Sequence, residues 1–401
     1  MIKRNKLIIF ILLFSLQFLH AENTDNKNKF LDVFLSASEV FYINLGVTTA
    51  NNLITGYEWS YFLPEIIKEN FTLPPIWDYS SFTRNQLAHP YFGSLYFNAA
   101  RTSDLNFYES FLFTAAGSVM YETLIERGNI SINDLITTSF AGSLTGEMLF
   151  RLGNEVCSKN LPCSFIINPV SFINYLIRKD TISCPYADTL NHSYSWSTLY
   201  DFNNKTALTG IALKVKYNDV YNTDTIKPLD QFFLRLNVLG GKEGFFYDYR
   251  LEGPLFSRHF NNHTAGICAI YEADKKIDSD FSNSSAGLFY SYSKDVNKFA
   301  LSYNCKLNYT MLGTCLPCKY GHGPSLNTFF ELDFKESGKF SADYNLFFLF
   351  PYDGSYTAFQ KLSVDYEIIF CKYFFINAQT IFVFNENTNC YLTFELGACF
   401  D

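Results

Sequence analysis

The sequence predicts an α+β membrane protein, in which an N-terminal helical region is followed by a C-terminal antiparallel transmembrane β-barrel of roughly twelve strands. Aromatic residues make up 18% of the 401 residues, whereas only 17% are charged, against ~25% charged in ordinary soluble proteins. After the N-terminal leader, no apolar run reaches the ~18 residues that a membrane-spanning helix needs. The C-terminal half instead alternates between apolar and polar residues, as strands do when one face meets lipid.

Residues 1–21 are predicted to be a signal peptide. Basic residues at positions 3, 4 and 6 precede an apolar stretch from Leu7 to Leu16, and Ala21 closes a cleavage site. The apolar stretch is too short for a membrane anchor. We therefore expect the chain to be exported and, because a barrel follows, to reside in the outer membrane.

Two helices can be recognised by their first residues. Asn106 precedes a helix predicted from Phe107 to Glu126, with Glu109 in the position of a capping-box acid. Ser131 precedes a second helix, predicted from Ile132 to Leu152. The caps indicate where each helix begins.

Small residues recur inside both helices, as Thr114–Ser118 in the first and Gly142–Gly146 in the second. Small residues on one face let two helix backbones approach closely, in membranes and in soluble helix pairs alike. We interpret them as packing positions and assign residues 22–155 to one helical domain.

A connector punctuated by Cys and Pro is expected over residues 156–192. The chain has 10 cysteines, and an exported protein can pair them. The one C-x-x-C motif, Cys315 to Cys318, lacks the second pair that a zinc site would need. We expect a loop disulfide or plain packing there, and neither a metal nor a cofactor.

Residues 193–401 are predicted to form the barrel. From Lys298 to Tyr309, one face carries Phe, Leu, Tyr and Cys, and the other carries Lys, Ala, Ser and Asn. The same split recurs in Gln231–Leu239, Ser325–Lys335, Lys361–Phe370 and Tyr391–Phe400. Such segments match the ~9–11 residues that a tilted strand needs to cross a bilayer. A soluble sandwich or lipocalin-like barrel, with its apolar face inward, is the alternative.

One stretch of the helical domain carries a family resemblance. From Asn85 to Arg101 it reads Asn-Gln-Leu-Ala-His-Pro-Tyr-Phe-Gly-Ser-Leu-Tyr-Phe-Asn-Ala-Ala-Arg. Together with Gly56–Trp59, Glu122, Ser131–Leu135, Gly142–Gly146, Glu147 and Arg151, it resembles the bacterial family known as domain of unknown function 3943. Looser matches follow at Arg250–Gly253, His263–Gly266 and Tyr320–Pro324. The resemblance implies a Gram-negative envelope protein with a helical part, a C-terminal barrel and no established activity.

The polar residues of this region are the candidate site. His89, Glu122 and Asp134 are the catalytic candidates, because a histidine with two carboxylates can act as an oriented general base. Candidate binding residues are Asn85, Gln86, Arg101, Ser131, Glu147 and Arg151. A structural role competes with both interpretations, because Glu147 and Arg151 are four residues apart and can pair on a helix, and Ser131 can cap one.

Two classes of function stay open. A formal net charge of −8 argues against a nucleic-acid partner, and no hydrolase or phosphate-loop motif is present. The first class is a non-enzymatic envelope barrel, plugged or braced by the helices, with a structural, channel or ligand-binding role. The second is an envelope enzyme that acts on lipid or cell-wall fragments through His89, Glu122 and Asp134. The expected partners are outer-membrane lipid and the barrel-assembly machinery, and a small molecule in the lumen stays open.

Overall fold

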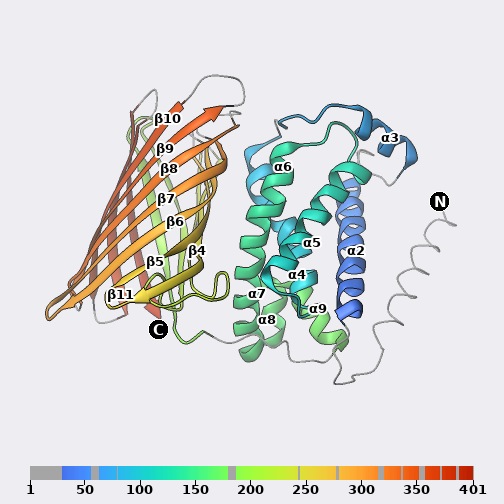
Figure 1. Cartoon of the computed structure of the whole chain (residues 1–401). Helices are drawn as coiled ribbons and strands as arrows, with labels where there is room; N and C mark the ends of the chain where they lie inside the picture. Colours follow the sequence, from blue (N-terminus) through green and yellow to red (C-terminus); the bar gives the residue numbers. More distant parts are fainter. Residues whose placement is uncertain are drawn as a thin grey trace.

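The computed structural model describes residues 29–55, 63–78, 80–178, 187–242, 244–276, 280–314, 320–335, 337–351, 357–370, 373–384 and 388–400. It has a helical bundle that stands beside a closed β-barrel (Figure 1). The predicted signal peptide and the pair Cys315 and Cys318 lie outside the described residues.

The bundle is built from the N-terminal part of the chain. Its α-helices are α2 (Lys29–Thr55), α3 (Pro64–Thr72), α4 (His89–Arg101), α5 (Phe107–Met120), α6 (Ile132–Ile136), α7 (Gly142–Lys159), α8 (Leu161–Ile167) and α9 (Pro169–Arg178). Single π-helical turns adjoin them at η1 (Arg84–Ala88), η2 (Tyr121–Ile125) and η3 (Thr137–Ala141).

The helix boundaries differ from the predicted ones because π-helical turns end or divide both predicted helices. The first predicted helix is α5 followed by η2, and the second is divided into α6, η3 and α7. A π turn adds one residue to a turn, which the apolar pattern of the sequence does not reveal. The predicted capping box is present, because the Asn106 side chain accepts the Glu109 N–H while the Glu109 carboxylate accepts the Asn106 N–H. The expected connector, 156–192, holds α8 and α9, so its described part from 156 to 178 is largely helical.

The barrel is a simple antiparallel meander. Its strands are β1 (Leu190–Asp201), β2 (Thr206–Tyr217), β3 (Phe232–Gly241), β4 (Gly244–Phe260), β5 (His263–Lys275), β6 (Asp280–Val296), β7 (Phe299–Thr314), β8 (Tyr320–Asp333), β9 (Gly338–Pro351), β10 (Thr357–Phe370), β11 (Phe374–Phe384) and β12 (Thr388–Phe400). Each strand pairs with its neighbours in sequence, and β1 pairs with β12 to close the ring. The predicted barrel of roughly twelve strands is confirmed.

The faces of the strands follow the predicted alternation. In β7, Leu307 and Tyr309 are 60% and 51% exposed on the outer wall, whereas Lys306 and Asn308 are buried on the lumen side. Since successive side chains of a strand point to opposite faces, the large apolar side chains from Phe299 to Tyr309 share the outer face, whereas Leu312, beyond a register shift, is buried.

The lumen is filled by two layers of inward-facing side chains. One layer is apolar and consists of Leu199, Leu208, Leu239, Phe246, Phe281, Phe347, Leu349, Phe359, Ile381, Val383 and Tyr391. The next layer is polar and charged. Along β10, for example, Phe359 lies in the apolar layer, and Lys361, two residues further, lies in the charged layer.

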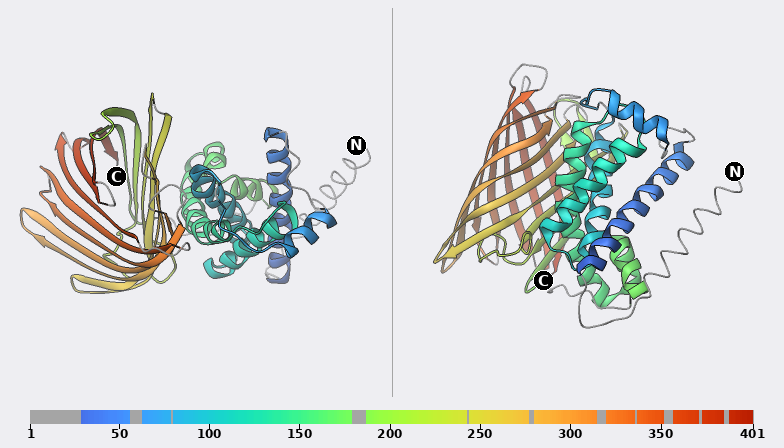
Figure 2. Two further views of the ribbon diagram at one scale, coloured as in Figure 1. Left: turned by 90° about the horizontal axis from the view of Figure 1, so that it is seen from above. Right: turned by 45° about the vertical axis from the view of Figure 1, so that its right-hand side comes forward.

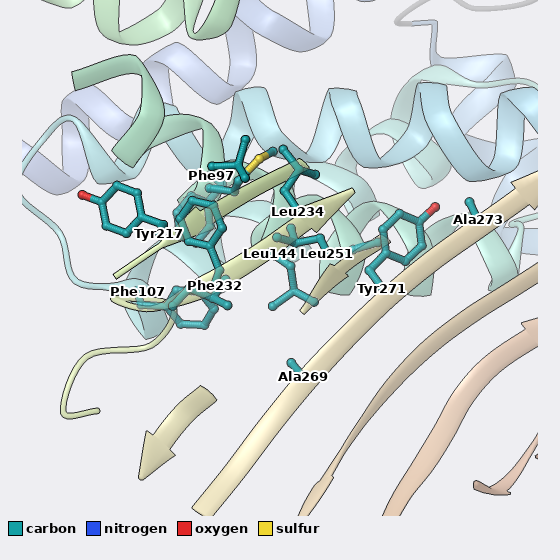
Figure 3. Close-up of a cluster of buried hydrophobic side chains, with 14 of the residues drawn as sticks. Phe97, Phe107, Leu144, Tyr217, Phe232, Leu234, Leu251, Ala269, Tyr271 and Ala273 are labelled. Carbon is teal, nitrogen blue, oxygen red and sulfur yellow. The ribbon is translucent and has the colours of Figure 1, made fainter. Parts of the chain in front are cut away.

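The bundle packs against the outside of the barrel wall. Figure 2, seen from above, shows the helices beside the ring of strands and outside its lumen. Side chains of α4 and α7, such as Phe97 and Leu144, pack with outward-facing side chains of β2 to β5, such as Phe232, Leu251 and Tyr271 (Figure 3). Of the two predicted arrangements, plug and brace, the structure agrees with the brace, because the apolar face of α7 packs on the apolar outer wall.

The close approach of α4 and α7 depends on glycines. A Cβ atom at Gly142 would lie 2.6 Å from the Cα atom of Gly93, and one at Gly93 would overlap the Thr138 carbonyl. The small residues predicted to permit close packing therefore act between α7 and α4.

Candidate functional site

A cavity opens at the end of the bundle where α4 begins and α5 ends. Its volume is about 110 Å³, and its lining comes from α2 (Val47, Asn51), η1 (Arg84, Ala88), α4 (His89, Phe92, Tyr96), α5 (Ser118), η2 (Tyr121, Glu122), Glu126 beyond it and η3 (Thr138). Two catalytic candidates, His89 and Glu122, thus line one cavity, and the third, Asp134, lies against His89.

Each π-helical turn contributes to this cavity. Turn η1 leads directly into His89, η2 contains Glu122, and η3 contains Thr138. Such turns are frequent at functional sites, because the extra residue changes the direction in which the following side chains point. The polar lining of the cavity therefore results from three local departures from regular α-helix.

The His89 ring is held from two sides. Its Nδ1 atom lies 3.2 Å from the Thr138 hydroxyl oxygen, and its Nε2 atom lies 3.6 Å from an Asp134 carboxylate oxygen. The first distance is that of a hydrogen bond, and the second is that of a longer electrostatic contact. A carboxylate and a hydroxyl on opposite ring nitrogens fix the orientation of an imidazole.

Burial raises the pKa of three acids at this end of the bundle. Burial, and then the neighbouring carboxyl groups of Glu126 and Asp134, raise the pKa of Glu122 to about 9. Burial, and then Asp134 and Asp78, raise the pKa of Glu126 to about 7. Burial also raises the pKa of Asp134, although His89 opposes this. At neutral pH, the Glu122 carboxyl is therefore a proton donor.

Backbone contacts fix the acid-bearing segment. One Glu122 carboxylate oxygen accepts the backbone N–H of Ser131 at 2.9 Å. The Ser131 hydroxyl accepts the backbone N–H of Asp134 at 3.3 Å and so caps α6 as predicted. The Asn70 amide donates to the carbonyls of Glu122 and Thr123 at 3.1 and 3.2 Å. The candidate binding residue Ser131 thus shapes the site through the backbone.

Two further binding candidates lie at the barrel wall. The Asn85 amide donates to the Tyr320 hydroxyl at 2.6 Å, and the Tyr271 hydroxyl donates to the Gln86 carbonyl at 2.5 Å. Both tyrosines belong to the barrel. Asn85 and Gln86 therefore fasten the bundle to the barrel, and neither lines the cavity.

The remaining candidates form a buried ionic triad elsewhere in the bundle. Arg101 Nε lies 2.8 Å from one Glu147 carboxylate oxygen, and Arg151 Nε lies 2.9 Å from the other. Arg101 is the last residue of α4, ~18 Å along the helix from His89 at 1.5 Å per residue. The triad joins α4 to α7 and takes no part in the cavity.

Most of the cavity residues were not predicted from the sequence, and three of them are titratable or hydrogen-bonding residues close to His89 or Glu122: Arg84, Thr138 and Glu126. Arg84 and Thr138 belong to π turns, whose positions the sequence did not indicate. Glu126 was treated as the end of a helix, although it follows Glu122 by four residues and could have been placed on the same helical face. Its spacing was the one available signal.

Comparison with solved structures gives weak likenesses to outer-membrane barrels. An outer membrane channel from Pseudomonas putida F1 is 12% identical at a TM-score of 0.33, covering 54% of this chain and 97% of its own. A loop-deletion mutant of OmpT from Vibrio cholerae is 8% identical at 0.31, with coverages of 53% and 98%. An anion-selective porin from Comamonas acidovorans is 8% identical at 0.29, with coverages of 53% and 99%. Nothing about a solute follows for this chain.

The family comparison concerns the helical domain. A search among curated proteins found no match. The family model described as domain of unknown function (DUF3943) matches residues 74–170, which include the predicted catalytic candidates and the ionic triad. The resemblance noted in the sequence is therefore confirmed over residues 74–170, where the chain matches the DUF3943 family model.

Proposed function

We propose that this is an outer-membrane protein in which the barrel is a closed membrane anchor and the helical domain binds a small amine. The proposal rests on a comparison between the lumen of the barrel and the interior of the bundle. In the part of the chain that the structure describes, inward-facing side chains fill two layers of the lumen, whereas a cavity of about 110 Å³ lies in the bundle.

The outer wall supports a position in the bilayer. Outward-facing Trp196, Ile211, Leu307 and Leu396 are between 58% and 63% exposed, although they are large and apolar. Large exposed apolar areas mark contact with membranes or partners. Because a closed barrel satisfies its own backbone hydrogen bonds, it is one of the two structures that can cross lipid.

Ion pairs across the lumen support the closed state. Lys361 of β10 lies 3.1 Å from Glu272 of β5, and Arg250 of β4 lies 3.0 Å from Asp343 of β9 and 2.7 Å from Glu252. Neither β5 and β10 nor β4 and β9 are neighbours in the sheet, so these side chains bridge the lumen. Leaving one charge of a buried pair without its partner costs ~3–5 kcal/mol of stability. Separation of these pairs, which opening of the lumen would require, is therefore unfavourable.

The carboxyl groups around the cavity favour a cationic ligand. Glu122 and Glu126 line it together with Arg84 and His89, and Asp134 lies against His89. Burial and the neighbouring carboxyl groups raise the pKa of Glu122 and Glu126, so an ammonium group would displace their protons and replace acid–acid repulsion with attraction. The small volume restricts the ligand to a few non-hydrogen atoms.

Conductance tests the closed barrel. The purified full chain, inserted into planar bilayers, is expected to show no steady conductance, because the lumen layers exclude a continuous water path. The double variant Glu272→Ala, Lys361→Ala removes both partners of one bridge and is expected to produce brief openings. A steady conductance in the wild-type protein would overturn the closed-anchor proposal.

Ethanolamine tests the pocket. In detergent at pH 8, it is expected to raise the melting temperature of the bundle saturably, whereas acetate leaves it unchanged. The double variant Glu122→Gln, Glu126→Gln is expected to lose the effect, and Glu65→Gln, an exposed position on α3, to keep it. No shift in the wild type, or an equal shift in the double variant, contradicts amine binding.

A second function, cleavage of an envelope lipid or cell-wall fragment, is favoured by one observation. His89 is oriented by Thr138 and Asp134, while the protonated Glu122 lines the same cavity, which provides a general base and a general acid. If this function is present, the wild-type protein turns over outer-membrane lipid or muropeptides. The variant His89→Gln is then expected to lose this turnover while its yield of folded protein stays unchanged. Absence of turnover would leave binding alone.

A further inference from the structure

Helix α5 has its polar and apolar faces inverted relative to a soluble bundle. Ser110, Thr114 and Ser118 are buried to within 2% exposure. On the opposite face, Tyr108 is 61% exposed and Leu112 is 66% exposed. Helices of soluble proteins turn their apolar stripe toward the core, so water is an unfavourable neighbour for this face.

Helices α2, α8 and α9 repeat the inversion. Each buries small polar residues, Ser36 and Asn44 in α2, Ser164 in α8, and Ser171 and Asn174 in α9. Each exposes large apolar ones, Phe30, Phe34 and Leu53 in α2, Phe165 and Ile166 in α8, and Ile173 and Leu176 in α9. Contrary to the expectation that no apolar run after the leader is long enough, α2 over Lys29–Leu53 is long and apolar enough to cross a membrane, with a mean hydropathy of 1.4 and 22% burial.

Several hydrogen bonds join the polar side chains of the interior, although the hydroxyls of Ser110 and Ser171 have no partner in the structure. The Tyr96 hydroxyl donates to the Asn44 side chain at 2.6 Å. The Asn98 amide donates to the Gly146 carbonyl at 3.1 Å, and the Asn168 amide donates to the Asn98 side chain at 2.7 Å. Asparagine, serine and tyrosine bonding across helices, next to close glycine contacts, is the packing used where the surroundings are lipid.

Exposed charges lie at the two ends of the bundle. One end carries Lys29, Asp104 and Lys159, and the other carries Glu65 and Arg127. Between Glu109 and Glu122, α5 has no charged residue. The apolar face therefore forms a belt between two charged rims, as a membrane protein requires.

The bundle also stands at the height of the apolar outer wall. Outward-facing Leu251 and Tyr271 are fully buried where the bundle packs on the wall, whereas outward-facing Leu288 and Leu307 on β6 and β7 are 64% and 60% exposed. The bundle covers part of a wall whose other outward-facing side chains meet lipid. Its own outer face lies at the same height and is therefore placed to meet the same lipid (Figure 2). We propose that the helical bundle lies in the same bilayer as the barrel, with α2, α5, α8 and α9 in contact with lipid acyl chains.

Tryptophan quenching tests this location in the full chain. Leu112→Trp and Phe34→Trp add a fluorophore at exposed positions, so the fold is not disturbed, and Glu65→Trp is the control at a charged rim. In vesicles of phosphatidylcholine brominated on the acyl chains, the fluorescence added at positions 112 and 34 is expected to fall at least twofold relative to unbrominated vesicles. The fluorescence added at position 65 is expected to be quenched by aqueous iodide.

Two results would overturn the proposal. Quenching of positions 112 and 34 by iodide but not by brominated lipid would place the bundle in water. Protection of both positions from both quenchers would mean that protein, such as a second copy of the chain, covers this face. Circular dichroism and heat-modifiable migration on gels show that each variant is folded, so a misfolded sample is recognised and excluded.

Discussion

At the scale of residues, burial decides which acids of the cavity keep a proton. Glu122 is 4% exposed, and its carboxylate would have to share the site with Glu126 and Asp134. A buried acid among other acids takes up a proton more readily than it tolerates a charge. The same property that prepares Glu122 for proton donation therefore lowers the stability of the domain at high pH.

This cost predicts a pH dependence of stability. The pKa of Glu122 is 4.5 for the free side chain and about 9 in the folded protein. Between these values, the folded state binds a proton that the unfolded state has lost, so the free energy of unfolding falls as pH rises. Helix melting followed by circular dichroism is expected to show this decline between pH 5 and 9. Glu122→Gln is expected to reduce the slope, and Glu65→Gln to leave it unchanged. An equal slope in Glu122→Gln would mean that other groups cause it.

The candidate site was predicted in part because its strongest signals are local. The His89 motif, Glu122 and the Ser131 cap can be read from neighbouring residues in the sequence. The path of α4 separates the ionic triad of Arg101, Glu147 and Arg151 from the cavity. A second long-range feature is the hydrogen bond of Asn85 to Tyr320, a partner 235 residues away. No short-range pattern contains such information.

At the scale of elements, one close contact sets the distance between α4 and α7. Gly93→Ala is expected to destabilise the bundle by ~1–3 kcal/mol, the usual cost of overpacking, because the added Cβ meets the Thr138 carbonyl. Gly46→Ala is the matched control, since nothing lies within 4 Å of its Cβ position on α2, and alanine is the better helix former. Thermal melts that fall for Gly46→Ala as much as for Gly93→Ala would contradict this account.

Strands were predicted better than helices, for a physical reason. Residues of β7 alternate because one face of the strand meets lipid and the other meets the lumen. The polarity of each residue therefore predicts the face on which it lies. The bundle has an inverted pattern in α5 and π turns at its helix ends, and both weaken the usual periodic signal. A helix such as α9 is defined mainly by what it packs against, Asn174 donating to Thr102 at 2.7 Å, which the sequence does not display.

At the scale of the whole molecule, the apolar contact between bundle and wall joins the two parts. Leu251→Ala, at the centre of that contact, is expected to lower the free energy of unfolding of the bundle by ~2–5 kcal/mol, as buried leucines do. Leu307→Ala changes an equivalent outward position that is 60% exposed and is expected to have little effect. Helix melting and protease resistance of the bundle measure the difference. If the two variants behave alike, the contact does not hold the bundle in place.

The one-sided attachment of the bundle makes the molecule uneven around its circumference. The helices pack mainly on strands β2 to β5, whereas Trp196 and Leu396 at the seam between β1 and β12 are 58% and 61% exposed. In a crowded two-dimensional sheet of barrels, neighbours can approach this exposed flank but meet helices on the other. Any cluster that these proteins form must therefore orient each molecule by its exposed flank. In a ring of molecules with these flanks turned inward, the helices would lie on the outer circumference.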